Sequence, residues 1–593
     1  MVYESSYESG RKPFRPDTTR GFWAAPNDFL YACWGLAFKM DVFSLSWYHF
    51  FELGIFSIIP YLICMILFVV PIILIQSFLG QFSSSGFISA FRLAPLFKGM
   101  GYISLALNFS ILTYYSIFAA IPLIYLFHSM RPTLPWSCEA YLEWAKNVPS
   151  QGARNICNDE IIGDTTTTIP FGIGDDDNDT MIYHYMGTYQ IPSVNYNLLD
   201  EKDVDFSMPW QLVLSMFLVW ILVALIFYNF GKSDKMGKFI RYTMWLLIAL
   251  LLICVSRLIF LTDARDALYD YFISHHPDVI TGLGSIPFLS VSSFGAGWGA
   301  IVSLASYNKF KTNITRFSWF ICLGQLNILC FLQLSLALTN STYSARTEQF
   351  WVLFLSSGSA MAHMELPNMW CILFFSMLVL SALLIIVTQF FAMLTAIFDE
   401  FEYLRPRKLE VTLGLIGLLA LCSIYFCSNH GLTYFTALPA DAMFTQTVLN
   451  LLLLLIVLWI YGRVRFQRDI EFMLGQRFAT WRVYMLRFVA PLALLLTLLI
   501  SFLIAYFEHF FGSLVVVIVA IFLIGIPWLF IPGYAILSII QTTGPLGMRF
   551  KRCCRPTDWY PVDPEERQRY EDAMGNMDIT HQLNEVKNET EVN

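Results

Sequence analysis

The stretch from Ser292 to Phe310 reads Ser-Ser-Phe-Gly-Ala-Gly-Trp-Gly-Ala-Ile-Val-Ser-Leu-Ala-Ser-Tyr-Asn-Lys-Phe and lies within an apolar run of membrane-spanning length. Gly295, Gly297 and Gly299 alternate in it, and each glycine costs a continuous helix about 1 kcal/mol relative to alanine. Non-helical backbone at membrane depth survives only where it lines a cavity or is buried in protein. The glycines therefore fit a broken helix of the kind that holds solutes in transporters. Taken alone, they fit a glycine-rich packing face of an unbroken span equally well.

The composition of the chain is that of a polytopic, all-α membrane protein. Of its 593 residues, 56% are hydrophobic and only 14% are charged, whereas about 25% are charged in an average soluble protein. The twelve cysteines form no Cys-x-x-Cys motif and the histidines form no cluster, so we predict neither a metal site nor a redox site. No nucleophile–base arrangement is evident, and we do not expect an enzyme.

Twelve apolar runs are long enough, at about 20 residues, to cross the hydrocarbon core as helices. They cover residues 28–49, 55–79, 101–128, 209–229, 238–261, 284–306, 317–338, 371–398, 409–427, 442–461, 484–507 and 514–540. An even number of spans places both termini on one side of the membrane. We thus expect a twelve-helix domain over residues 28–540, between an N-terminal tail of residues 1–27 and a C-terminal tail of residues 541–593.

Basic residues indicate which side that is. Arg11 and Lys12 lie in the N-terminal tail and Arg549 and Lys551 open the C-terminal tail, whereas residues 428–440 on the opposite side carry no Lys or Arg. The positive-inside rule then predicts that both termini are cytoplasmic. The C-terminal tail is polar and lacks apolar periodicity, so we expect it to be mostly disordered.

The long loop of residues 129–208 should be extracellular. It contains the sequon at Asn178, and a second sequon at Asn340 lies in another outer loop, so both asparagines are candidate glycosylation sites. Cys138 and Cys157 are the only cysteines of the long loop. Because the extracellular compartment is oxidising, we expect them to form a disulfide; two free thiols are the alternative.

Several short motifs follow one another along the chain between about residue 20 and residue 545. They are Gly80-Gln-Phe82, Leu134-Pro-Trp136, Ala305-Ser-Tyr-Asn-Lys-Phe310, Asp399-Glu-Phe401, Trp459-Ile-Tyr-Gly462, Asp469-Ile-Glu471 and Met473-Leu-Gly475. Each is weak alone, but their ordered set resembles the neurotransmitter:sodium symporter family. The resemblance implies twelve helices in the plasma membrane, the first ten forming two inverted five-helix repeats. It also implies that helices 1 and 6 are broken and hold a solute between their breaks.

The resemblance implies a function as well. Family members move amino acids, amines or related osmolytes by alternating access, coupled to sodium and usually to chloride. We therefore expect a secondary active transporter whose partners are a small amino acid or amine and the lipid bilayer, without nucleic acid. The competing hypothesis is a membrane protein that keeps the family fold but does not transport, such as a scaffold, receptor or partner subunit.

The family's ion ligands are mostly missing from this chain. Aligned from Gly35 and Ala37, the asparagine ligand of the first helix becomes Val42, and the two side-chain ligands of the eighth become Leu384 and Ile385. Sodium and chloride coupling is thus expected from the family but is not supported by the site residues. The positions that remain as ion-binding candidates are Gly35, Ala37, Phe38, Ser293 and Gln325.

Lys39 stands where the family has an acidic residue or glycine, and Asp41 is two residues away. Because a charged side chain inside the membrane is costly, such a residue usually has a functional role. Lys39 could serve as a fixed cation in place of sodium, or titrate and couple transport to protons. Sodium coupling through backbone carbonyls, or a Lys–Asp pair in a site that no longer transports, are the alternatives. The expected solute-lining residues are Lys39, Asp41, Tyr115, Ser292, Ser293, Phe294, Gly297 and Trp298.

The family's cytoplasmic gate is better preserved. An arginine before the first helix meets an aspartate at the end of the eighth, and Arg20 and Asp399 hold those positions, with Tyr307 expected near them. If water-exposed, such a pair would contribute only about 0–1 kcal/mol, which suits a gate that must reopen.

Overall fold

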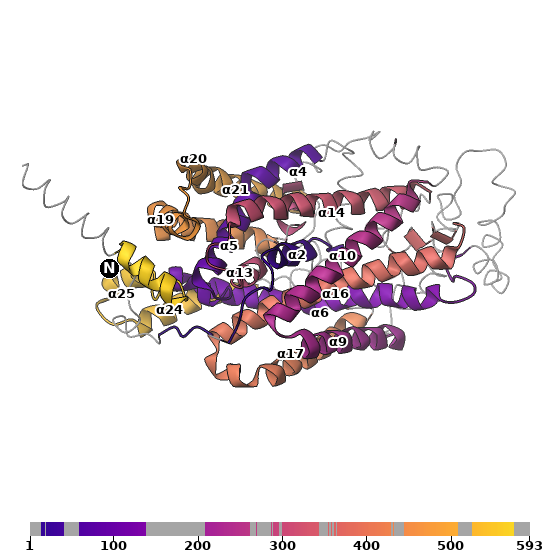
Figure 1. Ribbon diagram of the computed structural model, residues 1–593, viewed down its shortest axis with the longest axis horizontal. Coiled ribbons are helices and arrows are strands. Elements are labelled where there is room, and N and C mark those ends of the chain that lie inside the picture. The colour runs from indigo at the N-terminus through magenta and orange to yellow at the C-terminus, as the bar shows by residue number, and fades with distance from the viewer. Residues whose placement is uncertain are drawn as a thin grey trace, which may run out of the picture.

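The computed structural model describes residues 13–17, 19–40, 58–137, 208–260, 269, 286–287, 289–293, 295, 299–342, 354, 357–358, 361–362, 364–428, 431, 444–507 and 525–574. Within these residues the chain is helical (Figure 1). The α-helices are α2 (Asp28–Gly35), α4 (Ile58–Cys64), α5 (Val70–Ser83), α6 (Gly99–Ser129), α9 (Trp210–Phe230), α10 (Ser233–Leu258), α13 (Ala300–Ala305), α14 (Ile314–Thr342), α16 (Pro367–Glu400), α17 (Lys408–Ser423), α19 (Arg463–Leu474), α20 (Thr480–Tyr484), α21 (Ala490–Phe507), α23 (Ile526–Trp528), α24 (Phe530–Gln541) and α25 (Leu546–Cys553). Short 3-10 or π-helical turns extend or join them at Met65–Val69, Ser89–Leu93, Pro95–Phe97, Glu402–Arg407, Ile424–Cys427, Ile456–Gly462 and Met485–Val489.

Nine stretches of the described chain are long and apolar enough to span a membrane. They are Ile58–Ser83, Pro95–Ser129, Trp210–Phe230, Ser233–Leu258, Ile314–Ser335, Pro367–Glu400, Glu402–Cys427, Phe444–Leu474 and Thr480–Ile500. Each overlaps one of the runs predicted from the sequence. The three remaining runs, 28–49, 284–306 and 514–540, lie partly outside the described residues, so the total of twelve helices and the inverted repeats stay predictions.

Helices α6 and α16 form the centre of the bundle and lie side by side over much of their length (Figure 1). Both are buried on nearly every side, and a helix that is apolar all round is expected at the centre of a membrane protein. Aromatic stacking joins them, with the rings of Tyr125 and Phe375 4.9 Å apart. Of the two central helices, α16 packs against α2 and α13.

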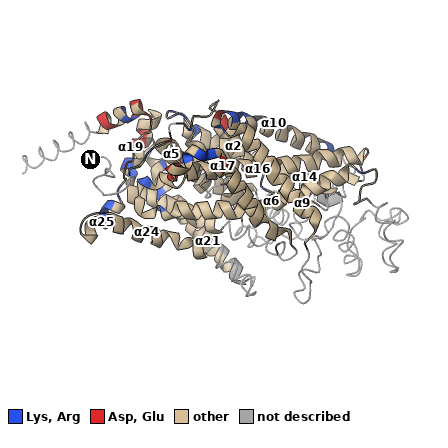
Figure 2. Cartoon of the chain, turned by 90° about the horizontal axis from the view of Figure 1, so that it is seen from below, with Lys and Arg blue, Asp and Glu red and all other residues tan. Residues whose placement is uncertain are grey.

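The charged residues are unevenly distributed over this bundle. Lys, Arg, Asp and Glu gather toward the end that carries α19 and α25, whereas the far ends of α9 and α14 are almost free of them (Figure 2). Because the bilayer interior is apolar, helix surfaces that face it must be apolar too. The charged end of the bundle would lie in the polar phase outside the hydrocarbon core.

Part of the C-terminal tail is folded, so the prediction of a mostly disordered tail is wrong for residues 542–574. Helix α25 is followed by a helical segment at residues 564–574, and Trp559 and Tyr570 are buried. Trp559 stacks on Phe82 at 5.0 Å, and Tyr570 meets the same ring at 5.5 Å. These aromatic contacts help to hold the segment to the bundle, and residues 575–593 lie outside the described part.

The N-terminal tail docks at the same end of the bundle. The backbone N–H of Phe14 donates to Asp558 at 3.2 Å. The guanidinium of Arg92 lies 3.3 Å from the centre of the Phe14 ring and donates to the carbonyl of Asp558 at 3.0 Å. We call this end, where residues 13–25 and 542–574 both dock, the tail face.

Candidate functional site

The first broken helix is visible between residues 35 and 40. Helix α2 ends at Gly35, residues 36–39 are not helical, and the helical conformation resumes at Met40. The N–H groups of Leu36 and Ala37 bond back to the carbonyls of Cys33 and Trp34 in a closing turn. The carbonyls beyond this turn lack the continuing helix that would normally bond them, so the break exposes backbone polar groups to the interior.

The second break contains the alternating glycines. Residues 289–293 are helical, whereas Gly295 and Gly299 have φ of +65° and +75°, and α13 begins directly after Gly299. Only glycine adopts such angles without strain. A Cβ atom at Gly299 would also lie 2.5 Å from Cγ of Phe87. An unbroken helix is therefore excluded at these two positions; Gly297 lies outside the described residues.

The two breaks face one another. A Cβ atom at Gly295 would lie 3.1 Å from the Cβ of Leu36. The ammonium of Lys39 donates to the backbone carbonyl of Ser292 at 2.9 Å. Lys39 thus connects the end of one break to the beginning of the other.

Lys39 is almost completely removed from solvent, with 1% of its surface exposed. Burying an ammonium costs several kcal/mol unless polar partners replace its hydration. The Ser292 carbonyl is one such partner: it accepts from the backbone N–H of Gly295 at 3.0 Å and from the ammonium of Lys39 as well. The hydrogen bond therefore gives the Lys39 ammonium a polar partner at the second break.

Tyr115 reaches the same place from α6. Its hydroxyl accepts a hydrogen bond from the backbone N–H of Met40 at 2.9 Å, and its ring stacks on Phe118 at 5.1 Å. The Tyr115 hydroxyl was expected to contact the solute, and here it is hydrogen-bonded to the backbone at the first break.

Two further predicted residues attach neighbouring helices to the breaks. The hydroxyl of Ser293 is hydrogen-bonded to the hydroxyl of Tyr61 on α4. The side-chain amide of Gln325 on α14 donates to the carbonyl of Cys33 at 2.7 Å, in the last turn of α2. Gln325 thus lies beside the last turn of α2, next to the first break, where its side-chain N–H is hydrogen-bonded to the backbone.

A small cavity lies beside Lys39. The centre of a water molecule can occupy about 10 Å³ of this cavity. The lining residues are Phe38, Lys39, Met40, Leu332, Met377, Leu378 and Ser381. That volume holds about one water molecule.

The structure does not place every predicted residue. Asp41, Phe294, Gly297, Trp298, Cys138, Cys157 and Asn178 lie outside the described residues. Asn340 lies in the last turn of α14, with its side chain outside the described part.

Thr388 was missed by the sequence analysis. Its hydroxyl is buried without a hydrogen-bond partner among the described residues, and it lies 3.7 Å from where a Cβ of Gly35 would be. Leu384, one turn earlier on α16, fills the space directly against Gly35, with Cδ2 3.2 Å from the same point. Counting along the sequence selected Leu384, and only the helix packing reveals the hydroxyl one turn away.

A second cluster of interacting side chains lies at the tail face. Arg20 donates to Asp399 at 2.7 Å and to the carbonyl of Ser84 at 2.9 Å, and also to the hydroxyl of Ser306. Its guanidinium lies 4.2 Å from the centre of the Tyr307 ring. We call Arg20, Asp399, Ser306 and Tyr307 the gate cluster.

The gate cluster is buried, which corrects the picture of a water-exposed pair. The side chains of Arg20 and Asp399 are only 9% and 4% exposed, and beside them Trp23 packs on Tyr307 with ring centres 5.2 Å apart. Asp399 also accepts the backbone N–H of Gly86 at 2.6 Å. Burial acts to lower the pKa of Arg20, but Asp399, Tyr307 and Asp17 together outweigh it and keep that pKa above its ordinary value. Removal of one partner from such a pair costs far more than at a surface.

Comparison with known proteins covers nearly the whole chain. The family model described as the sodium:neurotransmitter symporter family matches residues 20–542. The human sodium- and chloride-dependent neutral and basic amino acid transporter B(0+) is 26% identical, over 94% of this chain and 91% of that protein. The sodium-dependent acetylcholine transporter of Caenorhabditis elegans is 25% identical, over 92% and 79%.

A third relative is an insect protein. The sodium-dependent nutrient amino acid transporter 1 of Drosophila persimilis is 25% identical, over 94% of this chain and 87% of that protein. The family model spans well over half of the chain, and the facing helix breaks lie within the matched residues. The chain therefore belongs to the sodium:neurotransmitter symporter family.

Proposed function

We propose that this protein is a secondary active transporter that moves an amino acid or a similar small amine across the plasma membrane by alternating access. The observation that carries the proposal is the pair of facing helix breaks, joined by Lys39 and Ser292 at 2.9 Å. Relatives described as amino acid and acetylcholine transporters support the substrate class.

We also propose that the tail face is cytoplasmic. The basic residues near both tails support this orientation, and the N-terminal and C-terminal segments dock at one end of the bundle. In this orientation the closed gate cluster blocks the route to the cytoplasm, and transport requires the Arg20–Asp399 pair to separate.

Lys39 is proposed to act as a fixed cation in place of sodium. Its ammonium bonds a carbonyl of the second break directly, which is the type of hard oxygen ligand that sodium would use. The leucine at position 384, packed against Gly35, supports the same idea because a hydrocarbon side chain offers no ligand there. Chloride coupling has no side-chain support in the sequence.

Two alternatives rest on specific observations. Sodium could still bind through carbonyls of the first break together with the buried hydroxyl of Thr388. A protein that does not transport is favoured by the cavity of about 10 Å³ and by the engagement of Tyr115 with Met40, because both reduce the room for a solute.

A solute-uptake panel tests the proposal. Cells that express the wild-type chain or Lys39→Ala are given radiolabelled amino acids and amines, in sodium medium and in choline medium, and surface expression is measured in parallel. We expect at least one solute to accumulate above the level of vector-transfected cells, with uptake lost in Lys39→Ala. If the wild type reaches the surface and accumulates nothing, the transporter proposal is overturned and the non-transporting alternative is favoured.

A further inference from the structure

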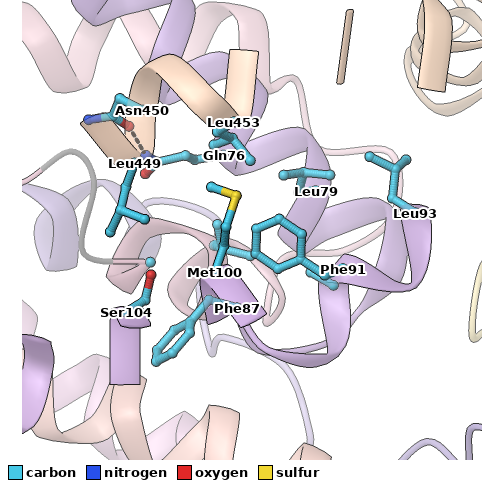
Figure 3. A pocket seen from close by; sticks show the side chains of 13 residues that line it. Gln76, Leu79, Phe87, Phe91, Leu93, Met100, Ser104, Leu449, Asn450 and Leu453 are labelled. Carbon is cyan, nitrogen blue, oxygen red and sulfur yellow. Dashed lines mark hydrogen bonds between the residues drawn. The ribbon is translucent and has the colours of Figure 1, made fainter. Parts of the chain in front are cut away.

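A second cavity lies away from the helix breaks, between α5, the residues leading into α6, the start of α13 and the span Phe444–Leu474 (Figure 3). In the same measure its volume is about 30 Å³, which is room for about two or three water-sized groups. Its lining is mostly apolar and includes Leu79, Phe91, Met100, Leu449 and Leu453.

Two carboxamides interrupt this apolar lining at one end. Gln76 on α5 donates its side-chain N–H to the side-chain oxygen of Asn450 at 2.9 Å (Figure 3). Their other polar atoms, Oε1 of Gln76 and Nδ2 of Asn450, are buried with no hydrogen-bond partner in the described part of the chain. The two residues are only 2% and 1% exposed.

This pattern does not depend on how the amide groups are oriented. Exchange of oxygen and nitrogen in both side chains reverses the hydrogen bond but still leaves one carbonyl oxygen and one NH₂ group unused. Buried polar groups without partners are unfavourable, so the pair favours an occupant that offers one donor and one acceptor. Among the described residues that line the cavity none is charged, and a charged occupant would lack a counter-ion.

We propose that this cavity binds a small neutral solute with a carbonyl and an NH₂ group on the same carbon, that is, a primary carboxamide. The ligand NH₂ would donate to Gln76 and its carbonyl would accept from Asn450, while its alkyl end faces Leu79 and Met100. Acetamide matches the available volume. The site is separate from Lys39, and its occupancy does not require the protein to transport.

The cavity also adjoins α13, the helix that directly precedes Ser306 and Tyr307 of the gate cluster. Gly299 and Val302 line it, and α13 ends beside Ser306, whose hydroxyl accepts from Arg20. A bound carboxamide therefore contacts α13 in its closed position. We expect binding to stabilise the folded, closed protein against heat, since a ligand that binds only this state raises its stability by mass action.

The test is equilibrium binding of radiolabelled acetamide to the purified full-length chain in lipid nanodiscs. We expect saturable binding at one site per chain, with a dissociation constant of about 1–10 mM for so small a ligand. Unlabelled propionamide should compete. Acetone, which has the carbonyl and shape but no N–H donor, and acetate, which is charged, should not.

Two variants of similar volume locate the site. Gln76→Met and Asn450→Leu should each weaken binding by at least about tenfold, whereas Gln389→Met, a control at an equally buried glutamine outside the cavity lining, should bind as the wild type does. If Gln76→Met fails to fold by thermal unfolding, Asn450→Leu decides. Absence of saturable binding to the folded wild type, which would mean that only water fills the cavity, overturns the proposal, as does unchanged binding to a folded Asn450→Leu variant.

Discussion

The gate cluster and the facing helix breaks have diverged to different degrees from the family pattern. At the gate, Arg20 and Asp399 keep the expected residue types and meet at 2.7 Å. At the breaks, hydrocarbon side chains replace the expected ligands, and a buried lysine bonds the backbone instead. Under the proposed function, this contrast means that closing of the tail face has been retained while the means of balancing charge at the centre has changed.

The Arg20–Asp399 pair should hold the tail face in its closed conformation. Asp399→Ala leaves the guanidinium of Arg20 buried without its counter-ion, which should destabilise the closed conformation by about 3–5 kcal/mol. A cysteine introduced at Ser303, a buried position of α13, should then react much faster with a membrane-impermeant maleimide added from the tail face.

The control for that experiment is Arg407→Ala. Arg407 and Glu410 form an exposed pair at 3.9 Å, so its loss should leave the labelling rate unchanged. A labelling rate in Asp399→Ala equal to that of the wild type would contradict the gating role of the pair.

The folded C-terminal segment should support the same closed face. Trp559 is buried and stacks on Phe82, and its indole N–H donates to Asp469 at 3.3 Å. Trp559→Ala should weaken docking of residues 542–574 by up to about 3 kcal/mol and expose them to limited proteolysis. Trp481→Ala, at a side chain that is 64% exposed, serves as the control, and equal proteolysis of the two variants would refute the docking role.

Replacement of Lys39 tests the role of its charge at the facing helix breaks. Lys39→Met keeps the length of the side chain but leaves the Ser292 carbonyl without its ammonium partner, so uptake of the best solute should fall at least about tenfold, or 1.4 kcal/mol. Lys311→Met is the matched control, because that lysine is 64% exposed and pairs with Glu566. Full activity of Lys39→Met at normal surface expression would argue against any role for the charge.

The smallest expected effect comes from the edge of the tail face. Burial of the Asp17 carboxyl opposes its ionisation, but hydrogen bonds from Lys408 and Thr19 outweigh this and hold the pKa of Asp17 below its ordinary value. The contribution of the ionised Asp17 carboxylate to the free energy of unfolding is therefore present above a pH of about 4. It is lost as the pH falls through the lowered pKa.

Because Lys408 is partly exposed, the contribution of this pair should be only roughly 0.2–1 kcal/mol. Thermal unfolding of the wild type and of Asp17→Asn should differ slightly at pH 7 and converge in acid. A difference that grows with acidity would contradict the assignment.

Local patterns explain what the sequence could predict. The alternating glycines alone fitted a broken helix and an unbroken packing face equally well, and the family resemblance favoured the break. The positive φ values of Gly295 and Gly299 explain why glycine stands at these two positions. The resemblance brought Arg20 and Asp399 together although 379 positions separate them. Nine of the spans followed from apolar length alone.

Features that depend on distant partners could not be predicted in this way. Trp559 and Tyr570 stand in a polar segment, and their partners Phe82 and Asp469 are far away in sequence. Gln76 and Asn450 meet across 374 positions. Thr388 was missed because its relation to Gly35 depends on the rotation of α16, which no count along the chain provides.

The central claim is that Lys39 takes the place of a sodium ion at the helix breaks. Equilibrium binding of radioactive sodium to the purified wild-type chain tests it without requiring transport. The account predicts no saturable sodium binding at physiological concentration. Saturable binding that is lost in Thr388→Val would contradict it and would show that the ion site has moved rather than disappeared.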